Sequence, residues 1–463
     1  MPRKDRQPNR ALATLITEAG FSNKGLADRV NRVGRLRGVS ELRYNHSSVT
    51  RWLRGEQPRS PVPQLICEVL TVELGRRVTV ADIGMKTSKV PTGVGLELPT
   101  TQCNSARIAG LLWKADNEQH RRLLECDFDQ SAFTAAALRW LVGPWDPTPL
   151  QGTGRRIGAA DVEEIREVTH AFRILDNRLG GGHVRVPVIE YLHTHVGPML
   201  RDGRCTEEVR RQLFSAAADL TKVAAWLYHD LDKQGLAQRY LIQALAMAKF
   251  AGDVSLGAEI LAAMSQQCLY VAQPGRAVDL ARTAQTAAQR AGIPVLMTEC
   301  HVMEARGYAA QRESRACAHA LTRAESTFER TTSTKAPAWL GYFDQAYFAA
   351  KIAHCFRDLG EPAKAEDYAT RSLNMDPTYQ RGKAFNIAVL SMTLAAQGKV
   401  DEACTQGRIA INLAAGLTSA RVYRYIRNVD RSLAPYGDER PVRDLREYAE
   451  QRLPALRPRG GHP

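Results

Sequence analysis

HSSVTRWLRGEQPR, residues 46–59, decides the fold of the amino-terminal part of the chain. The stretch predicts one short helix, capped by Asn45 or Ser47 and ended by Gly55 and Pro58. Apolar residues recur in it at helical spacing, so one face of the helix is apolar: Val49, Trp52 and Leu53. Because a helix this short is unstable alone, we expect it to dock on a small bundle.

The opposite face of this predicted helix carries small polar side chains and arginines. Side chains of this kind can hydrogen-bond to base edges in the major groove of DNA. We therefore predict base contacts from four residues: His46, Ser47, Thr50 and Arg51. Arg51 suits guanine, since a guanidinium group can form two parallel hydrogen bonds with that base. The alternative is an ordinary solvated helix face.

Two further helices are predicted before this stretch. Residues 11–19 carry Leu12, Leu15 and Ile16 at helical spacing and end at Gly20, and a second helix covers residues 24–30. Free backbone N–H groups at the start of the second helix favour a phosphate group. We therefore predict phosphate contacts from Asn23 and Lys24, together with three arginines: Arg43, Arg54 and Arg59.

The order of these elements resembles the helix-turn-helix of phage-repressor-like transcriptional regulators. The resemblance rests on "GLADRV", "SSVTRWLRG" and "PQLICEVLTVEL". In that family the second helix of the motif enters the major groove. One departure is the segment from Asn31 to Asn45, which is longer than the usual turn and contains Arg32, Arg35, Arg37 and Arg43. Extra loop length costs little entropy, so the motif can survive it.

The distribution of charge agrees with a phosphate-bearing partner. The net charge of the 463-residue chain is +14, and residues 1–60 hold thirteen Lys and Arg against five Asp and Glu. The alternative is a basic surface that only aids solubility. The nine cysteines show no CxxC spacing, and neither a signal region nor a membrane-spanning run is present, so we expect buried, reduced thiols in a cytoplasmic protein without membrane contact.

The chain length and patterning predict an all-α protein of several parts. We expect a DNA-binding domain over residues 1–85, a linker and connecting helices over 86–155, a helical repeat domain over 156–455 and a disordered tail over 456–463. The Thr-, Gly- and Pro-rich run from Lys86 to Cys103 indicates a linker or an extended arm.

Weak self-similarity marks the carboxy-terminal half. Pairs of small residues seven positions apart, such as Ala237 with Ala244 and Ala403 with Ala410, begin near residues 237, 277, 316, 365 and 403. Small residues at this spacing allow two helices to pack closely. The pattern resembles tetratricopeptide repeats of ~34 residues, although the spacings here are longer and uneven. We expect five degenerate units forming an α-solenoid with a concave groove.

Both halves together resemble a family of actinobacterial helix-turn-helix transcriptional regulators with a tetratricopeptide-like repeat domain. The strings that carry this resemblance are "SSVTRWLRGEQPR", "VTVADIGM" and "QGLAQRYLIQAL". It implies a transcriptional regulator that binds double-stranded DNA. Because a single helix-turn-helix buries limited surface on DNA, we expect a homodimer, and we expect the repeat domain to dimerise the protein, to sense a peptide, small-molecule or protein ligand in its groove, or both. The competing hypothesis is an interaction scaffold or peptide receptor without direct DNA readout.

Other stretches favour structural interpretations. "LGGGH" at 179–183 lacks the Lys-Ser/Thr of a phosphate loop and predicts an interhelical turn. Aromatic residues at 339–348 are either inter-repeat core or the wall of a ligand groove. The segment 376–386 and the arginines Arg421, Arg424 and Arg427 are candidates for lining that groove. We find no motif for catalysis, a cofactor or a metal, and expect a protein that is not an enzyme.

Overall fold

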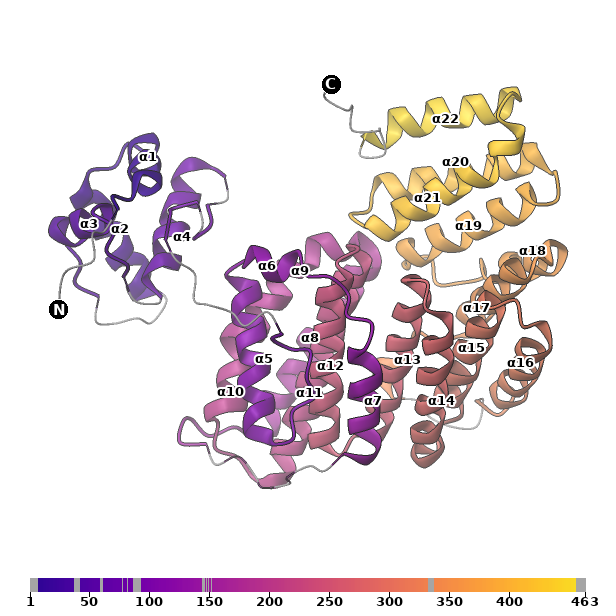
Figure 1. Cartoon of the computed structure of the whole chain (residues 1–463), viewed down its shortest axis with the longest axis horizontal. Helices are drawn as coiled ribbons and strands as arrows, with labels where there is room; N and C mark the ends of the chain where they lie inside the picture. Colours follow the sequence, from indigo (N-terminus) through magenta and orange to yellow (C-terminus); the bar gives the residue numbers. More distant parts are fainter. Residues whose placement is uncertain are drawn as a thin grey trace. The chain divides into compact units, whose positions relative to one another are not determined.

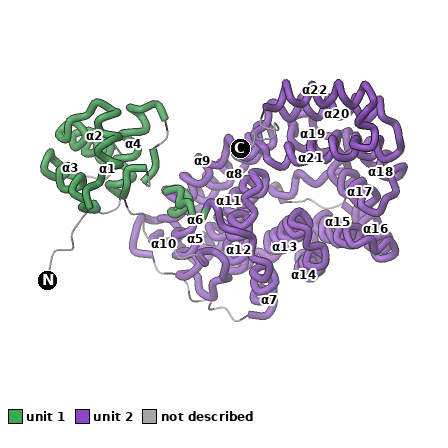
Figure 2. Tube along the Cα trace, turned by 45° about the horizontal axis from the view of Figure 1, so that its top comes forward, with its two compact units in different colours: residues 1–92, 114–123 green, residues 93–113, 124–463 purple. Residues whose placement is uncertain are grey.

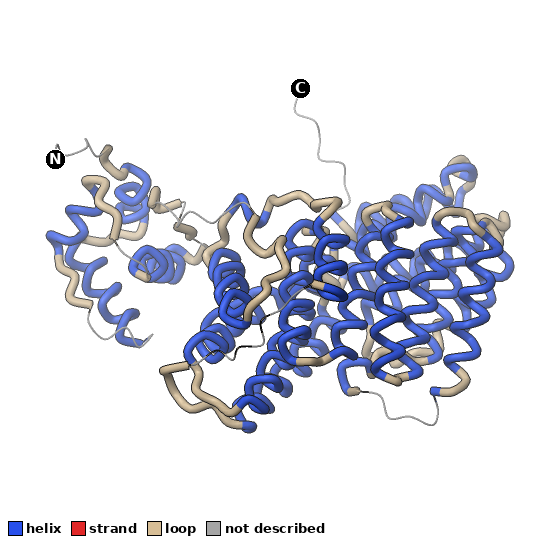
Figure 3. The backbone as a smooth tube through the Cα atoms, turned by 60° about the horizontal axis from the view of Figure 1, so that its bottom comes forward, coloured by secondary structure: helices blue, strands red, loops and turns tan. Residues whose placement is uncertain are grey.

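The computed structural model describes residues 7–36, 42–58, 61–76, 78–80, 82–85, 93–143, 146, 148, 150, 152–331 and 337–454. Its regular secondary structure within these residues is helical, with two isolated β-bridges, so the all-α prediction is confirmed (Figure 3). The expected tail at 456–463 lies outside the described residues. No helix among the described residues combines the length and apolar character needed to cross a bilayer.

The chain divides into two compact units (Figure 2). The first comprises residues 1–92 and 114–123, and the second comprises residues 93–113 and 124–463. The helix α5 (Gln102–Asn117) contributes residues to both units. Much of the region expected to be a separate connection over 86–155 therefore belongs to the second unit.

Four helices form the core of the first unit: α1 (Arg10–Glu18), α2 (Asn23–Leu36), α3 (His46–Leu53) and α4 (Val62–Leu74). The apolar residues expected to face inward are buried, including Leu12, Leu26, Val49 and Trp52. Burying these side chains removes apolar surface from water and stabilises helices too short to persist alone.

Asn9 forms three hydrogen bonds that connect separate segments of the first unit. Its side-chain oxygen caps α1 by accepting from the backbone N–H of Leu12 at 3.0 Å. Its side-chain nitrogen donates to the carbonyl of Ile83 at 2.8 Å, and its backbone N–H donates to the carbonyl of Leu53 at 2.8 Å. One buried residue thus joins the start of α1, the end of α3 and the segment after α4.

The second helix is longer than the sequence pattern predicted. It continues through Asn31 to Leu36, so part of the segment expected to be a loop is helical. Asn31 also closes the connection to α3. Its amide donates to the carbonyl of Tyr44 at 2.7 Å and accepts from the backbone N–H of Tyr44 at 2.9 Å.

The second unit is built around consecutive antiparallel helix pairs (Figure 1). Within the described residues the pairs are α11 (Glu207–Asp230) with α12 (Gln234–Ala251), α13 (Val254–Tyr270) with α14 (Pro274–Ala291), α15 (Pro294–Ala310) with α16 (Ser314–Phe328), α17 (Gln345–Leu359) with α18 (Pro362–Arg371), and α19 (Gln380–Ala395) with α20 (Val400–Ala415). This sequential packing is that of a helical repeat solenoid and agrees with the five predicted units.

Additional helices flank these pairs. Before them come α7 (Ala132–Val142), α8 (Ala159–Leu179), α9 (Gly181–Tyr191) and α10 (Gly197–Asp202), with a π-helical turn at Leu192–Val196, whereas α6 (Arg121–Leu124) belongs mostly to the first unit. After them come α21 (Ala420–Ser432) and α22 (Arg440–Arg452). Short 3₁₀ turns lie at Ala338–Leu340 and Ala434–Tyr436.

Small residues explain why the paired helices approach closely. Ala237, Ala277, Ala365 and Ala403 on the second helices are fully buried. The third unit begins at the buried Cys317 rather than at the expected Ala316, which is only half-buried. The first helices carry a small residue twelve positions earlier in each unit, a feature the sequence analysis missed: Ala225, Ser265, Ala305, Ala353 and Ser391.

Two of these small residues make equivalent hydrogen bonds. The Ser265 hydroxyl donates to the carbonyl of Ala277 at 2.7 Å, and the Ser391 hydroxyl donates to the carbonyl of Ala403 at 2.7 Å. The same side chain in the same place of two units supports their structural equivalence.

The segment expected to be a linker or arm is packed against α12 in its described part. Arg239 donates to the carbonyl of Val94 at 2.6 Å, and Gln243 donates to the carbonyls of Gly95 and Glu97, each at 3.0 Å. Val94 and Leu98 are buried. Both anchoring side chains belong to the string "QGLAQRYLIQAL", so part of that string serves to hold the arm.

The helical array closes on itself through the glycines of "LGGGH". The backbone N–H of Thr418 donates to the carbonyl of Leu179 at 3.1 Å, and that of Gly182 donates to the carbonyl of Thr418 at 3.1 Å. A Cβ on Gly182 would lie 2.2 Å from Thr418 Cγ2, and one on Gly181 would lie 2.8 Å from the carbonyl oxygen of Leu227. The expected interhelical turn is reduced to Gly180, because Gly181 and Gly182 already begin α9, and the specific role of these two glycines is close packing.

All nine cysteines are unpaired thiols. Six of them are buried, Cys126 and Cys205 are half-buried, and Cys103 is exposed.

Candidate functional site

The exposed face of α3 holds three of the four residues predicted to contact bases. His46, Ser47 and Arg51 are exposed, whereas Thr50 is half-buried. The opposite face is fixed in the core by Val49 and Trp52. Asn45 caps this helix by accepting from the backbone N–H of Ser48 at 3.1 Å. The helix is therefore held at its start and along one side, and its polar face points to solvent.

The start of α2 lies beside the middle of α3. Asn23 Nδ2 is 3.4 Å from Thr50 Oγ1, and the Thr50 hydroxyl donates to the carbonyl of His46 at 3.0 Å. Thr50 therefore links two helices rather than presenting a free hydroxyl hydrogen. Lys24, next to Asn23 at the start of α2, is exposed.

The remaining predicted phosphate contacts are distributed around α3. Arg43 precedes this helix and Arg54 follows it, and both side chains are exposed. Arg59 lies outside the described residues. Arg51 Nη1 approaches Glu56 Oε1 at 3.8 Å in a largely exposed ion pair, which is too weak to hold the guanidinium group in one place.

Sequence reasoning did not identify what orients α3. The Tyr44 ring meets the Trp52 ring edge-on, with centroids 5.1 Å apart, and Asn31 fixes the backbone of Tyr44. The only signal was an amide side chain, Asn31, in an otherwise helical stretch. A side chain that bonds both backbone groups of one residue can replace the short turn usual between two such helices.

A second candidate site is a cavity of about 250 Å³ in the helical unit. It is lined mainly by the first helices of the pairs and by α8 and α21. As expected, the segment 376–386 and Arg421 contribute to its lining. Arg424 instead lies over the ring of Tyr270, 4.3 Å from the ring centroid.

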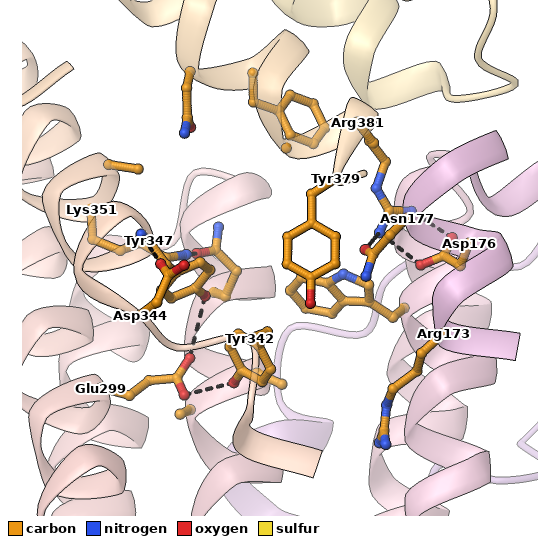
Figure 4. A pocket seen from close by; sticks show the side chains of 18 of the residues that line it. Arg173, Asp176, Asn177, Glu299, Tyr342, Asp344, Tyr347, Lys351, Tyr379 and Arg381 are labelled. Carbon is orange, nitrogen blue, oxygen red and sulfur yellow. Dashed lines mark hydrogen bonds and ion pairs between the residues drawn. The ribbon is translucent and has the colours of Figure 1, made fainter. Parts of the chain in front are cut away.

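A buried ion-pair network closes one side of the cavity. Arg381 of α19 donates to both carboxylate oxygens of Asp176 on α8, at 2.5 and 2.7 Å, as Figure 4 shows. Arg381 also lies 3.4 Å from Asp230 of α11, which accepts from the Ser419 hydroxyl at 2.8 Å. These contacts join the early helices of the array to the late ones.

The aromatic cluster at 339–348 serves both of the roles considered for it. Phe343 and Phe348 are buried and pack against Phe328, so they belong to the core. Trp339, Tyr342 and Tyr347 line the cavity. Tyr379 projects its ring into the cavity from the segment before α19 (Figure 4).

Two buried carboxylates share one hydroxyl in the cavity wall. Tyr342 Oη lies 2.7 Å from Glu299 Oε2 and 3.1 Å from Glu259 Oε1. Burial, and then the neighbouring Glu259 carboxylate, raise the pKa of Glu299 to about 7. Glu259 Oε2 pairs with Lys222 Nζ at 2.7 Å, and the raised pKa of Glu299 lets that carboxyl group change protonation near neutral pH.

Comparison with known proteins adds one finding for the amino-terminal unit. Residues 12–86 match the family described as the SP15 N-terminal domain. No curated protein and no solved structure matches the chain. The chain therefore consists of an SP15 N-terminal domain match followed by a long all-helical region.

Proposed function

We propose that the protein is a sequence-specific, DNA-binding transcriptional regulator. Its first unit would read DNA through α3, and its helical unit would mediate homodimerisation, ligand sensing or both. The observation that carries the proposal is the polar face of α3, which is exposed beside the start of α2 while Val49 and Trp52 anchor the opposite face. This is the arrangement that a helix-turn-helix needs.

The charge of the amino-terminal residues supports the same function. Residues 1–60 supply eight of the fourteen net positive charges of the chain, an excess that favours a polyanionic partner. A single recognition helix buries little surface on DNA, so we propose two chains reading two half-sites about one helical turn, or a multiple of it, apart.

The test is a selection of binding sites from random double-stranded DNA with the full-length chain, followed by gel shifts. A two-fold symmetric enriched site supports the proposal. Equal binding to all sequences would contradict sequence-specific DNA recognition and would favour an interaction scaffold. Light scattering of the protein with and without the selected site gives the number of chains bound.

Two substitutions separate base reading from phosphate contact. Arg51→Ala should weaken binding to the selected site by about 1–3 kcal/mol and relax the preference at one base position. Lys24→Ala should weaken binding to all sequences and lower the slope of log K against log salt by about one unit. Arg76→Ala is the matched control, because it removes an equal charge from an exposed pair with Glu18. Unchanged base preference in Arg51→Ala would show that this arginine does not read a base.

A further inference from the structure

Two buried cations in the cavity of the helical unit lack a carboxylate partner. Arg306 of α15 and Lys351 of α17 are 8% and 9% exposed. Arg306 Nη1 and Lys351 Nζ each lie 2.8 Å from the same oxygen, Oε1 of Gln266. Among the described residues, no carboxylate oxygen lies within 4.0 Å of either group, and Arg306 Nε has no hydrogen-bond partner.

The other cations lining the cavity have a carboxylate within 4.0 Å, the longest such contact being that of Arg421 with Asp230 at 3.9 Å. Lys222 meets Glu259 at 2.7 Å, Arg381 meets Asp176 at 2.5 Å, and Arg173 pairs with Asp219. The cavity therefore does not lack carboxylates in general. The absence of one is specific to the place where Arg306 and Lys351 meet.

This arrangement is electrostatically unfavourable when the cavity holds no anion. Because both nitrogens contact one oxygen, they cannot be further apart than twice 2.8 Å. Burial, and then the Arg306 charge, hold the pKa of Lys351 well below its ordinary value. In direct contact, the compensation is a neutral amide oxygen and the Tyr347 ring, 4.7 Å from Lys351 Nζ, and the more distant Glu299 carboxylate opposes the lowering of the Lys351 pKa only in part.

The rest of the cavity suits a flat, apolar body. Its walls include the half-buried rings of Trp226, Trp339 and Phe385, and Tyr379 projects into it (Figure 4). A volume of about 250 Å³ lies just under the roughly 300–1,000 Å³ of typical drug-sized ligand sites and suits a small molecule. Glu259 and Glu299 line the same cavity and disfavour a second anionic group.

We propose that this cavity binds a small organic acid, a planar apolar molecule with a single carboxylate or phosphate group that lies between Arg306 and Lys351. The anionic oxygens satisfy both cations, as the paired carboxylates do elsewhere in the cavity, and the apolar body contacts the aromatic walls. The inference does not depend on DNA binding, so either proposal can fail without the other.

The first test measures binding to the full-length chain by calorimetry and thermal shift. The probes are indole-3-acetate, its neutral counterpart indole-3-ethanol, its cationic counterpart tryptamine, phenyl phosphate and inorganic phosphate. At least one of the two ring-bearing anions should raise the melting temperature, whereas the neutral and cationic probes should not. Whichever anion binds more tightly identifies carboxylate or phosphate as the preferred group, and inorganic phosphate alone should bind more weakly because it lacks the ring.

Arg306→Gln should weaken binding of the preferred anion at least tenfold, while Arg315→Gln, at an exposed position of the next helix, should leave it unchanged. The proposal is overturned if neither ring-bearing anion binds at millimolar concentration, or if the anions and the neutral probe bind equally well.

The second test needs no ligand. Lys351→Met removes a buried amine that has no carboxylate partner and whose charged form is disfavoured by burial and by Arg306, so the melting temperature of the ligand-free protein should rise. Lys222→Met is the matched control: it leaves Glu259 without its lysine, so the melting temperature should fall. If both variants melt at lower temperature than the wild type, Lys351 is a structural residue and the proposed site is lost.

Discussion

Glu299 shows how one buried residue couples stability to pH. The residue is 5% exposed, and the pKa of its carboxyl group is raised from 4.5 to about 7 by burial and by Glu259. At pH values between 4.5 and about 7, a carboxyl group with such a raised pKa is protonated to a greater extent in the folded state than in the unfolded state. Its contribution to the free energy of unfolding therefore falls as pH rises through that window.

We accordingly expect Glu299→Gln to stabilise the protein at pH 8 by about 1–3 kcal/mol, with a difference that shrinks towards pH 5. The amide oxygen of glutamine can still accept from the Tyr342 hydroxyl, so the substitution removes the charge with little change in shape. Urea unfolding at the two pH values measures the difference. The exposed Glu313→Gln serves as control, and equal effects of both substitutions at both pH values would contradict the assignment.

A second residue-scale expectation concerns Glu56. Its carboxylate lies 3.8 Å from the Arg51 guanidinium group and competes with DNA for that charge. Glu56→Gln should therefore tighten binding to DNA, by less than about 1 kcal/mol because the pair is largely exposed. The gain should diminish as salt is added, and titrations of the selected site at two salt concentrations measure it. Weaker binding by this variant would indicate that Glu56 orients Arg51 instead.

At the scale of elements, the turn inside each helix pair repeats one backbone feature. A residue with positive φ lies five positions before the first small residue of each second helix: Asp232, Ala272, Arg312, Gly360 and Gly398, with φ between 59° and 79°. The left-handed backbone conformation raises the free energy of a residue with a side chain by roughly 1–2 kcal/mol, whereas glycine adopts it without this strain. In three of the five turns a residue other than glycine therefore occupies a position that glycine would suit better.

Ala272→Gly should consequently stabilise the protein by up to about 1 kcal/mol. The rest of the gain from relieving the left-handed backbone is offset by the greater conformational freedom of glycine in the unfolded chain. Gly360→Ala is the reciprocal change and should destabilise by about 1 kcal/mol. Chemical unfolding of both variants tests the pair. A loss of stability in Ala272→Gly comparable to that of a glycine inside a helix would argue against this interpretation.

The elements that the sequence predicted well are those with a local cause. Small residues such as Ala277 and Ala403 mark close helix contacts wherever they occur, so the five pairs were predictable. The third unit was displaced by one residue because Cys317, a small side chain outside the alanine pattern, occupies the buried position. The length of α2 was underestimated because Asn31 looks like a loop residue until its bonds to Tyr44 are seen.

The cavity could be predicted only in part. Its aromatic wall and its arginines were candidates by position along the repeats, but the pairing of Asp176 with Arg381 joins residues 205 positions apart. Nor does any sequence pattern indicate that Arg306 and Lys351 lack a carboxylate, because that depends on which side chains three different helices bring to one point.

At the scale of the whole molecule, the arm after residue 93 and the helix α7 are part of the helical unit. Gln238 exchanges hydrogen bonds with the backbone of Asp129, Arg239 and Gln243 hold residues 94–97, and Lys249 donates to the carbonyls of Arg139, Trp140 and Gly143. A fragment that starts near Leu150 loses these partners and exposes the surface of α12 that they cover.

We therefore expect a fragment of residues 93–463 to melt at a higher temperature, and in a sharper transition, than one of residues 150–463. Both should be helical, so circular dichroism can follow each transition. If the shorter fragment were equally stable, the contacts of α12 with the preceding segment would contribute nothing measurable to folding.

The contact between Leu179 and Thr418 has a consequence for how this architecture can change in evolution. In an open solenoid a unit can be duplicated or deleted, since each unit needs only its neighbours. Here the early and late helices meet through Thr418, Arg381 and Ser419. Adding or removing one unit would move the early and late helices apart or force them together. Their contact therefore fixes the number of units. Lineages that retain this contact should vary in loop length and side chains instead.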